Sequence, residues 1–233
     1  TWFKPFDGGV LHEIFSLGDN RHSQTGGLLQ FRYYGHLDAN ATFNLLAYDA
    51  GSSTVAFDIS QDKVLSDDTW YHIAVVRSGN DYLFFVDGTQ LGSTVTNSTS
   101  TYYWANHDAY LLINARKYRV TQPLGDNNIP KDIITGESAS YDDIRFTKGT
   151  ARYTSNFTAP ISEFQTDSGL NPPTFSEKSS TGHTVTLIDN AGQTAGGSGG
   201  KFGEGYTFDG LGDYLTILGH ADWDVAAGDF TFE

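Results

Sequence analysis

The sequence contains no cysteine and no methionine among its 233 residues. Without cysteine no disulfide can hold the fold and thiolate chemistry is excluded, so the hydrophobic core must stabilise the protein. Hydrophobic residues make up 38% of the chain and aromatic residues 14%, which is enough for such a core. Because translation starts with Met, the sequence is expected to be a processed or excised segment.

Basic residues are scarce. Lys and Arg number 14 against 28 Asp and Glu, which gives a formal net charge of −14. So acidic a surface repels nucleic-acid phosphate, and no basic stripe offsets it, so nucleic acid is not expected as a partner. No apolar run approaches the ~20 residues that span a bilayer, so membrane insertion is not expected either. The acidity suits solubility in salty water and the binding of divalent cations.

Long helical patterns are also absent, and short strand-like runs recur instead. These runs cover residues 28–34, 42–48, 54–59, 70–77, 82–86, 89–91, 110–115 and 141–147. Asp87-Gly88 between two apolar runs predicts a type I′ hairpin, which needs positive φ at both central residues. The pattern predicts an all-β fold, a two-sheet antiparallel jelly-roll sandwich. The residues predicted to be mostly buried are Trp70, Ile73, Val75, Leu83, Phe85, Leu112 and Ile144.

The character of the sequence changes after residue 165. Residues 166–205 are rich in Gly, Ser and Pro and are interpreted as a linker with a short strand at 184–188. Strand-like order resumes over 206–233, and the chain both starts and stops in mid-strand. If Glu233 were followed by another Thr1, the period-2 alternation of the strand would continue across the junction.

Three stretches resemble a known family. Residues 68–77 with 83–89 resemble the central hairpin of laminin-G-like, concanavalin A-like lectin/glucanase domains. Residues 141–164 resemble the closing strand and tail of those domains, and residues 201–215 with 229–233 resemble their opening. The opening segment therefore stands behind the closing segment. That order occurs in a tandem array cut inside a module and in a circularly permuted single domain.

The resemblance implies an origin and a partner. The sequence is more similar to tandem-repeat modules of marine phage tail and fibre proteins and bacterial surface adhesins than to animal laminin. This implies an extracellular, cell-surface or virion-surface location, with other copies of the chain as head-to-tail partners. Residues 1–165 would lack their opening strands, which 206–233 would supply to a neighbouring copy or, by permutation, to the same copy. The residues of the joining strand are Phe230, Phe232, Glu233, Thr1, Trp2 and Phe3.

Four carboxylates are candidates for a structural Ca²⁺ site, which many members of this fold hold. Asp209 and Asp213 flank a Gly-rich turn, where carboxylates and bare carbonyls come together. Asp142 and Asp143 lie on the strand that closes the same sheet in the family. The alternative is that these residues cap turns.

The loop over residues 102–108 combines aromatic and polar side chains. Its rings could stack on surface glycans, anchor a protein interface or pack on an edge of the sandwich. The candidate residues are Tyr102, Tyr103, Trp104, Asn106 and His107.

Catalysis is not expected. The Glu-x-Asp-x-x-Glu strand signature of glycoside hydrolases on this fold is absent, as are HExxH, GxSxG and P-loop motifs. The sequence favours a non-catalytic structural or adhesive module of a fibre, filament or virion appendage. The alternatives are an autonomous glycan-binding lectin and, less favoured, a glycoside hydrolase.

Overall fold

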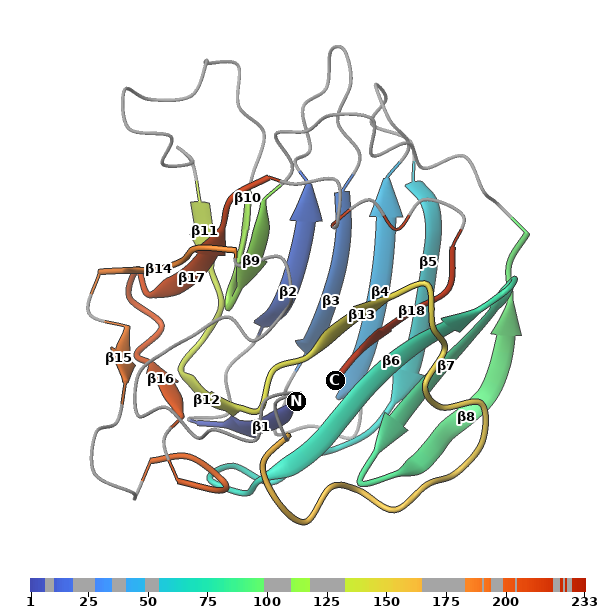
Figure 1. Ribbon diagram of the computed structural model, residues 1–233, viewed down its shortest axis with the longest axis horizontal. Coiled ribbons are helices and arrows are strands. Elements are labelled where there is room, and N and C mark those ends of the chain that lie inside the picture. The colour runs from blue at the N-terminus through green and yellow to red at the C-terminus, as the bar shows by residue number, and fades with distance from the viewer. Residues whose placement is uncertain are drawn as a thin grey trace.

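The computed structural model shows an all-β protein with two large antiparallel sheets (Figure 1). It describes residues 1–6, 11–18, 28–34, 41–48, 55–98, 110–117, 133–164, 183–189, 191–193, 199–203, 205–219, 223, 225 and 228–233. Within these ranges, no helix has the length and apolar character needed to cross a membrane. The predicted sandwich class is confirmed.

The first sheet has seven strands, in the order β14-β17-β9-β2-β3-β4-β5. Its strands are β14 (Val185–Ile188), β17 (Tyr214–Ile217), β9 (Leu111–Ile113), β2 (His12–Gly18), β3 (Leu28–Tyr34), β4 (Thr42–Tyr48) and β5 (Val55–Asp62). Beside it, β10 (Ala115–Lys117) and β11 (Ile133–Thr135) form a separate two-stranded sheet.

The second sheet has nine strands, with the path β13-β18-β6-β1-β12-β16-β15 and with β7 and β8 continuing outward from β6. Its strands are β1 (Trp2–Pro5), β6 (Tyr71–Ser78), β7 (Asp81–Val86), β8 (Thr89–Thr96), β12 (Ala139–Asp142), β13 (Phe146–Lys148), β15 (Gly192–Gln193), β16 (Tyr206–Phe208) and β18 (Phe230–Phe232). Strands from both ends of the chain thus belong to one sheet.

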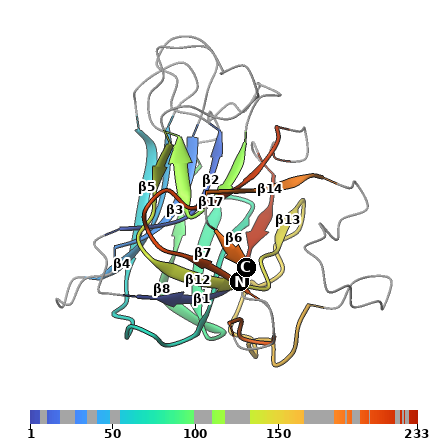
Figure 2. The same ribbon diagram turned by 90° about the vertical axis from the view of Figure 1, so that its left-hand side faces the viewer.

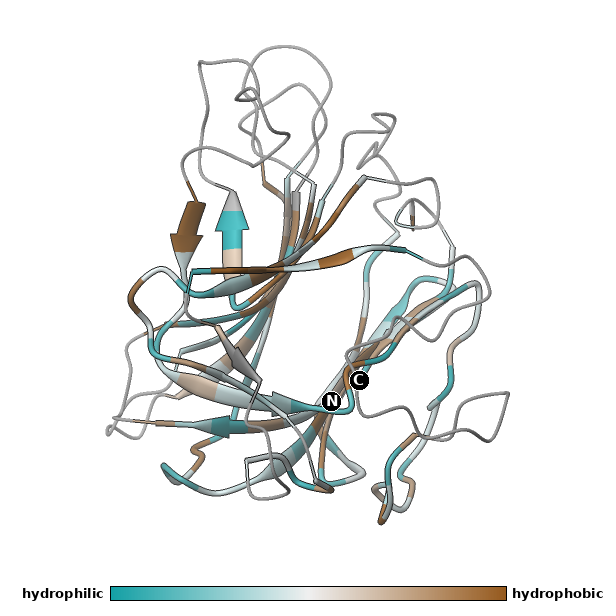
Figure 3. Ribbon diagram, turned by 60° about the vertical axis from the view of Figure 1, so that its left-hand side comes forward, coloured by the Kyte–Doolittle hydropathy of each residue, from teal (hydrophilic) through white to brown (hydrophobic). Residues whose placement is uncertain are grey.

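The core lies between the two sheets and is dominated by aromatic rings. Hydrophobic and hydrophilic residues intersperse along the strands of both sheets, so that one side of each strand can face the core (Figure 3). Phe15 of the seven-stranded sheet meets Phe232 of the nine-stranded sheet with ring centroids 4.4 Å apart, and Phe57 meets Tyr82 at 5.0 Å. Such offset and tilted ring pairs add to the free energy gained by burying their area.

A segment without regular strands covers the outer face of the nine-stranded sheet. Residues 149–164, called the strap here, place Tyr153 and Phe157 against a small cluster of buried residues that includes Val76 and Phe85. The Phe157 N–H donates to Gly88 O at 2.9 Å. The strap therefore gives the nine-stranded sheet a second apolar layer on the side away from the main core.

The predicted hairpin is confirmed, since Asp87 and Gly88 both have positive φ, at 50° and 76°. Gly88 is required for a second reason, because a Cβ there would lie 2.0 Å from the Phe157 carbonyl oxygen. The turn residue thus fits both the hairpin and the close approach of the strap.

Two predicted strands are each broken in the structure. The run at 141–147 divides at Asp143, whose φ is 49°, into β12 and β13. The run at 110–115 divides at Asn114, with φ 59°, so that β10 leaves the sheet to pair with β11. A short polar side chain tolerates positive φ and lets the strand change direction.

Most of the predicted core residues are buried. Ile73, Val75, Leu83, Phe85 and Leu112 are all buried. Trp70 and Ile144 are partly buried. Trp70 immediately precedes β6, and Ile144 lies in the break between β12 and β13, where strand alternation no longer fixes direction.

Candidate functional site

Strand β6 accepts two strands, β18 and β1, end to end along one edge. The pairs made by β18 are Phe230 with Arg77, Thr231 with Val76 and Phe232 with Val75. The pairs made by β1 are Trp2 with His72 and Phe3 with Tyr71. Both strands are antiparallel to β6, so they point the same way and read as two halves of one strand.

The ladder has no vacant position between these halves. Continuing the β18 register by one residue places Glu233 opposite Ala74, the neighbour of Ile73. Thr1 N donates to Ile73 O at 3.2 Å and Ile73 N donates to Thr1 O at 2.9 Å, which is the exchange of a regular antiparallel pair. The two chain ends lie together in both orthogonal views (Figures 1 and 2).

The alternation predicted across the junction is confirmed. Phe230, Phe232 and Phe3 point into the main core, and all three are fully buried. Glu233 and Trp2 are also buried, but on the opposite side, where Trp2 packs edge-on against the His72 ring.

Residues 206–233, called the C-terminal segment here, pair with strands of their own chain. Strand β16 lies along β12, β17 along β9, and β18 between β6 and β13. Within the residues predicted as a linker, β14 and β15 extend the two sheets by pairing with β17 and β16. Assembly between copies stays a prediction.

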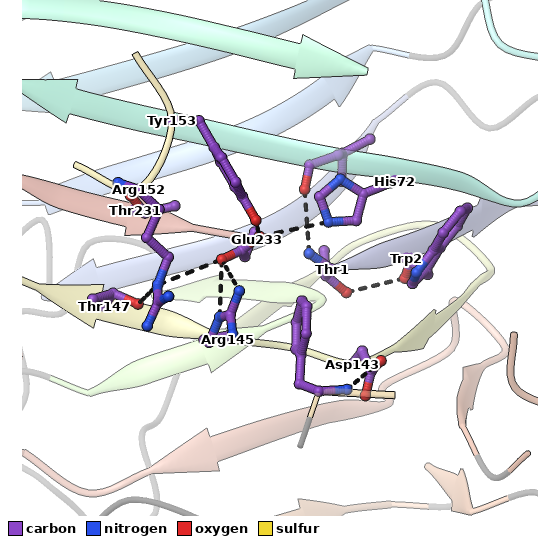
Figure 4. Close-up of polar contacts among 12 residues, drawn as sticks. Thr1, Trp2, His72, Asp143, Arg145, Thr147, Arg152, Tyr153, Thr231 and Glu233 are labelled. Carbon is purple, nitrogen blue, oxygen red and sulfur yellow. Dashed lines mark hydrogen bonds and ion pairs between the residues drawn. The ribbon is translucent and has the colours of Figure 1, made fainter. Parts of the chain in front are cut away.

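Glu233 lies in a buried polar cluster on the outer side of the nine-stranded sheet (Figure 4). Its carboxylate accepts hydrogen bonds from both Nε and Nη2 of Arg145, with the Nε contact at 2.9 Å, and from the Tyr153 hydroxyl. Arg152 Nε lies 3.6 Å from the same carboxylate. The Glu233 side chain is fully buried, so this charge depends on these partners in place of water.

Two neighbouring groups in the cluster are neutral at physiological pH. Burial, reinforced by the amino group of Thr1 and by Arg145, lowers the pKa of His72 to about 2. Its Nε2 lies 3.7 Å from Glu233, and because the ring is uncharged this contact is not an ion pair. Burial and the Glu233 carboxylate raise the pKa of Tyr153, which keeps its hydroxyl proton available for donation to Glu233.

The four carboxylates proposed for Ca²⁺ do not form one site. The register of β12 and β16 places Ala139 opposite Phe208 and Tyr141 opposite Tyr206, so Asp142 and Asp209 extend from opposite ends of this ladder. No group of three or more His, Cys, Asp or Glu side chains in the described ranges is arranged to hold a metal ion.

Each pair of these carboxylates instead accepts backbone N–H groups. Asp209 Oδ1 accepts from Leu211 N and Asp213 Oδ2 accepts from Asp209 N, at 2.7 and 3.0 Å. Asp142 uses one oxygen for Asp143 N and the other for Phe202 N. Asp143 Oδ2 accepts from Phe164 N at 3.0 Å. Turn capping, the alternative weighed for these residues, accounts for their contacts.

The predicted aromatic loop lies outside the described residues. This applies to Tyr102, Tyr103, Trp104, Asn106 and His107. Its proposed roles stay predictions.

A row of polar side chains crosses the outer face of the seven-stranded sheet. Glu13, Arg32, Asn44 and Ser60 lie directly opposite one another on β2, β3, β4 and β5. Arg32 Nη2 donates to Asn44 Oδ1 at 2.6 Å, and Asn44 Nδ2 donates to Ser60 Oγ at 3.0 Å. Burial raises the pKa of Glu13 to about 7, although Arg116 Nη1 is 2.8 Å away and opposes the shift.

Asn44 Nδ2 also donates to Asp58 of β5, so a second carboxylate joins the row. Glu13 lies on β2 and Asp58 on β5, and three strand spacings of about 4.8 Å separate those strands. Retaining hydrolases need about 5–5.5 Å between the two groups and inverting ones about 6.5–9.5 Å. The strand spacing between these two carboxylates is wider than either geometry, and the contacts of the row are those of a hydrogen-bonded network.

Comparison with known families agrees with this architecture. A laminin-G-type family model described as concanavalin A-like lectin/glucanases superfamily matches residues 1–123, more than half of the chain. The chain belongs to the concanavalin A-like lectin/glucanase superfamily. A search of curated proteins finds no match. Because the superfamily name covers both lectins and glucanases, membership shows the fold and leaves the activity to the site.

Sequence reasoning missed the partners of Glu233. Arg145, Arg152 and Tyr153 all lie in the stretch that resembles the closing strand and tail of this superfamily. Two arginines close together in a chain with only 14 basic residues were the available signal. The two arginines do not indicate which carboxylate they contact, because Glu233 is 88 residues away from Arg145 in the sequence.

Proposed function

We propose that the chain is a non-catalytic structural or adhesive module of an extracellular fibre, filament or virion appendage. Copies assemble head to tail when the C-terminal segment of one copy completes the sandwich of the next. The observation that carries the proposal is the continuous ladder of β18 and β1 along β6, with no position missing between Glu233 and Thr1.

The contacts of the C-terminal segment do not depend on which copy supplies it. β16, β17 and β18 each pair with a strand from the first 148 residues, so a neighbouring copy offers the same edges. Residues 165–182 connect the strap to the next described residues. Strand addition of this kind gives affinity through main-chain hydrogen bonds.

Cysteine cross-linking tests this directly, because the chain has no cysteine of its own. Ser140 on β12 and Thr207 on β16 are opposite each other, with hydroxyl oxygens 3.0 Å apart. A Ser140→Cys chain and a Thr207→Cys chain are unfolded in denaturant, mixed, refolded together and oxidised. Assembly in trans predicts a disulfide between the two chains, seen as a dimer on a non-reducing gel.

The control pairs Thr207→Cys with Lys148→Cys, an exposed position on β13 that does not pair with β16. This pair should give no specific dimer. If the mixture of Ser140→Cys and Thr207→Cys chains stays monomeric while a single chain carrying both changes closes an internal disulfide, the segment acts only within its own copy.

A second candidate is glycan binding. It is favoured by membership of the superfamily, whose name covers lectins. A glycan array decides between the two: a discrete saccharide ligand would favour the lectin, and no binding together with cross-linking in trans would favour the structural module.

A further inference from the structure

The outward side of β18 and its flanks makes side-chain contacts at every second residue. Asp229 Oδ1 accepts from Gly79 N at 2.7 Å. Thr231 Oγ1 accepts from Arg152 N at 2.9 Å and donates to Thr150 O at 3.1 Å. Glu233 follows, with Arg145 and Tyr153 on its carboxylate.

The inward side is different in kind. Phe230 and Phe232 fill the core, with Phe146 stacked on Phe230 and Phe15 against Phe232. Other large apolar residues would fill such sites with a modest loss of binding free energy. These rings therefore contribute affinity more than selectivity.

Among the outward residues, Glu233 would bind a site that lacks its partners at the greatest cost in free energy. It is a charge with no exposed surface, and its hydrogen-bond and ion-pair partners Arg145, Arg152 and Tyr153 come from residues 145–153. In turn Arg145 and Arg152 keep only part of their side chains exposed, 30% and 38%. A strand with a neutral residue at this position would leave two guanidinium groups facing a site without a carboxylate, and such unpaired charge disfavours binding.

We infer that residues 229–233 form a recognition code and that Glu233 is its selective element. The site formed by β6, β13 and the strap accepts a strand in which a carboxylate follows Phe-Thr-Phe. The partner it fits is therefore a second copy of this chain. This inference rests on the proposed function, since it names what the exchanged strand must carry.

The test is a competition between two donors in the full-length chain. A Ser140→Cys receptor chain is refolded with equal amounts of two donors, Thr207→Cys alone and Thr207→Cys combined with Glu233→Gln. The two mixed disulfides are then quantified by mass spectrometry. The code predicts at least tenfold less disulfide with the donor that carries Glu233→Gln. Comparable yields would overturn it.

The matched control is Glu13→Gln. Glu13 is also a fully buried glutamate beside an arginine, but it lies on the other sheet. A donor with Thr207→Cys and Glu13→Gln should compete nearly as well as its parent, because the exchanged strand is unchanged. If it loses as much as the donor with Glu233→Gln, the effect reflects general destabilisation and not recognition.

A second readout separates this inference from the proposed function. If no disulfide forms between chains with any donor, assembly in trans is wrong, yet the code can still be measured within one copy. Hydrogen exchange over residues 228–233 should then accelerate at least tenfold in Glu233→Gln and not in Glu13→Gln. Equal acceleration in both variants would overturn the code as well.

Discussion

The substitution Phe232→Ala tests whether the C-terminal segment is an integral part of the sandwich. Phe232 is fully buried and contacts rings of both sheets, with centroid distances of 4.4 Å to Phe15, 6.4 Å to Phe31 and 6.5 Å to Phe146. Removing a buried phenylalanine costs about 3–5 kcal/mol through lost burial and the cavity it leaves. The lost ring pairs place the expected value in the upper half of that range.

A loss of this size is a large fraction of the roughly 5–15 kcal/mol that typically separates folded from unfolded protein. The assay is urea unfolding followed by tryptophan fluorescence and, separately, by circular dichroism. Both probes should shift to a lower midpoint together, because the ring joins the two sheets.

Leu211→Ala in the same segment is the control for this prediction. Leu211 is 82% exposed, so its truncation should change the free energy of unfolding by no more than about 0.5 kcal/mol. A loss below about 1 kcal/mol for Phe232→Ala, or a change confined to one probe, would show that the body folds without the segment and would refute the reasoning.

Three further predictions concern the strap, the polar row and the Asp-rich turn. Gly88→Ala should detach the strap and lower the melting temperature well below that of Gly149→Ala. Both glycines have positive φ, but of the two only Gly88 has no room for a Cβ, which would meet the backbone of Phe157. Because burial raises the pKa of Glu13 from 4.5 to about 7, its protonation stabilises the folded state fully below pH 4.5, and that contribution is lost as the pH rises through 7. In urea titrations, the free energy of unfolding of the unsubstituted protein minus that of Glu13→Gln should therefore be larger near pH 4.5 than above pH 7. A difference that does not change with pH would contradict the pKa shift. Asp213→Ala should cost about 1–3 kcal/mol by leaving Asp209 N without its buried acceptor. That cost should be equal in Ca²⁺ and in EDTA by calorimetry, and a drop in melting temperature with EDTA confined to the unsubstituted protein would identify Asp213 as a cation ligand.

The strands and turns of this protein could be predicted from local sequence patterns. Short runs rich in apolar and aromatic residues located β3, β4, β6 and β7, because such runs are typical of buried strands. Asp87-Gly88 determined the hairpin between β7 and β8 through its backbone conformation. The period-2 alternation carried over from Phe232 to Phe3, and the structure keeps that phase along β6.

The contacts between residues far apart in the chain could not be predicted in this way, because they depend on the order and register of the strands in the folded protein. The carboxylates of Asp142 and Asp209 were equivalent candidates in the sequence, but the register of β12 against β16 separates them. Glu233 carried no sequence signal beyond its place in a strand, and its contacts with Arg145 and Tyr153 exist because β18 lies between β6 and β13 under the strap. Strand order within a sheet brings together residues far apart in the chain, and a period of two residues specifies a face of the sheet but not the neighbouring strand.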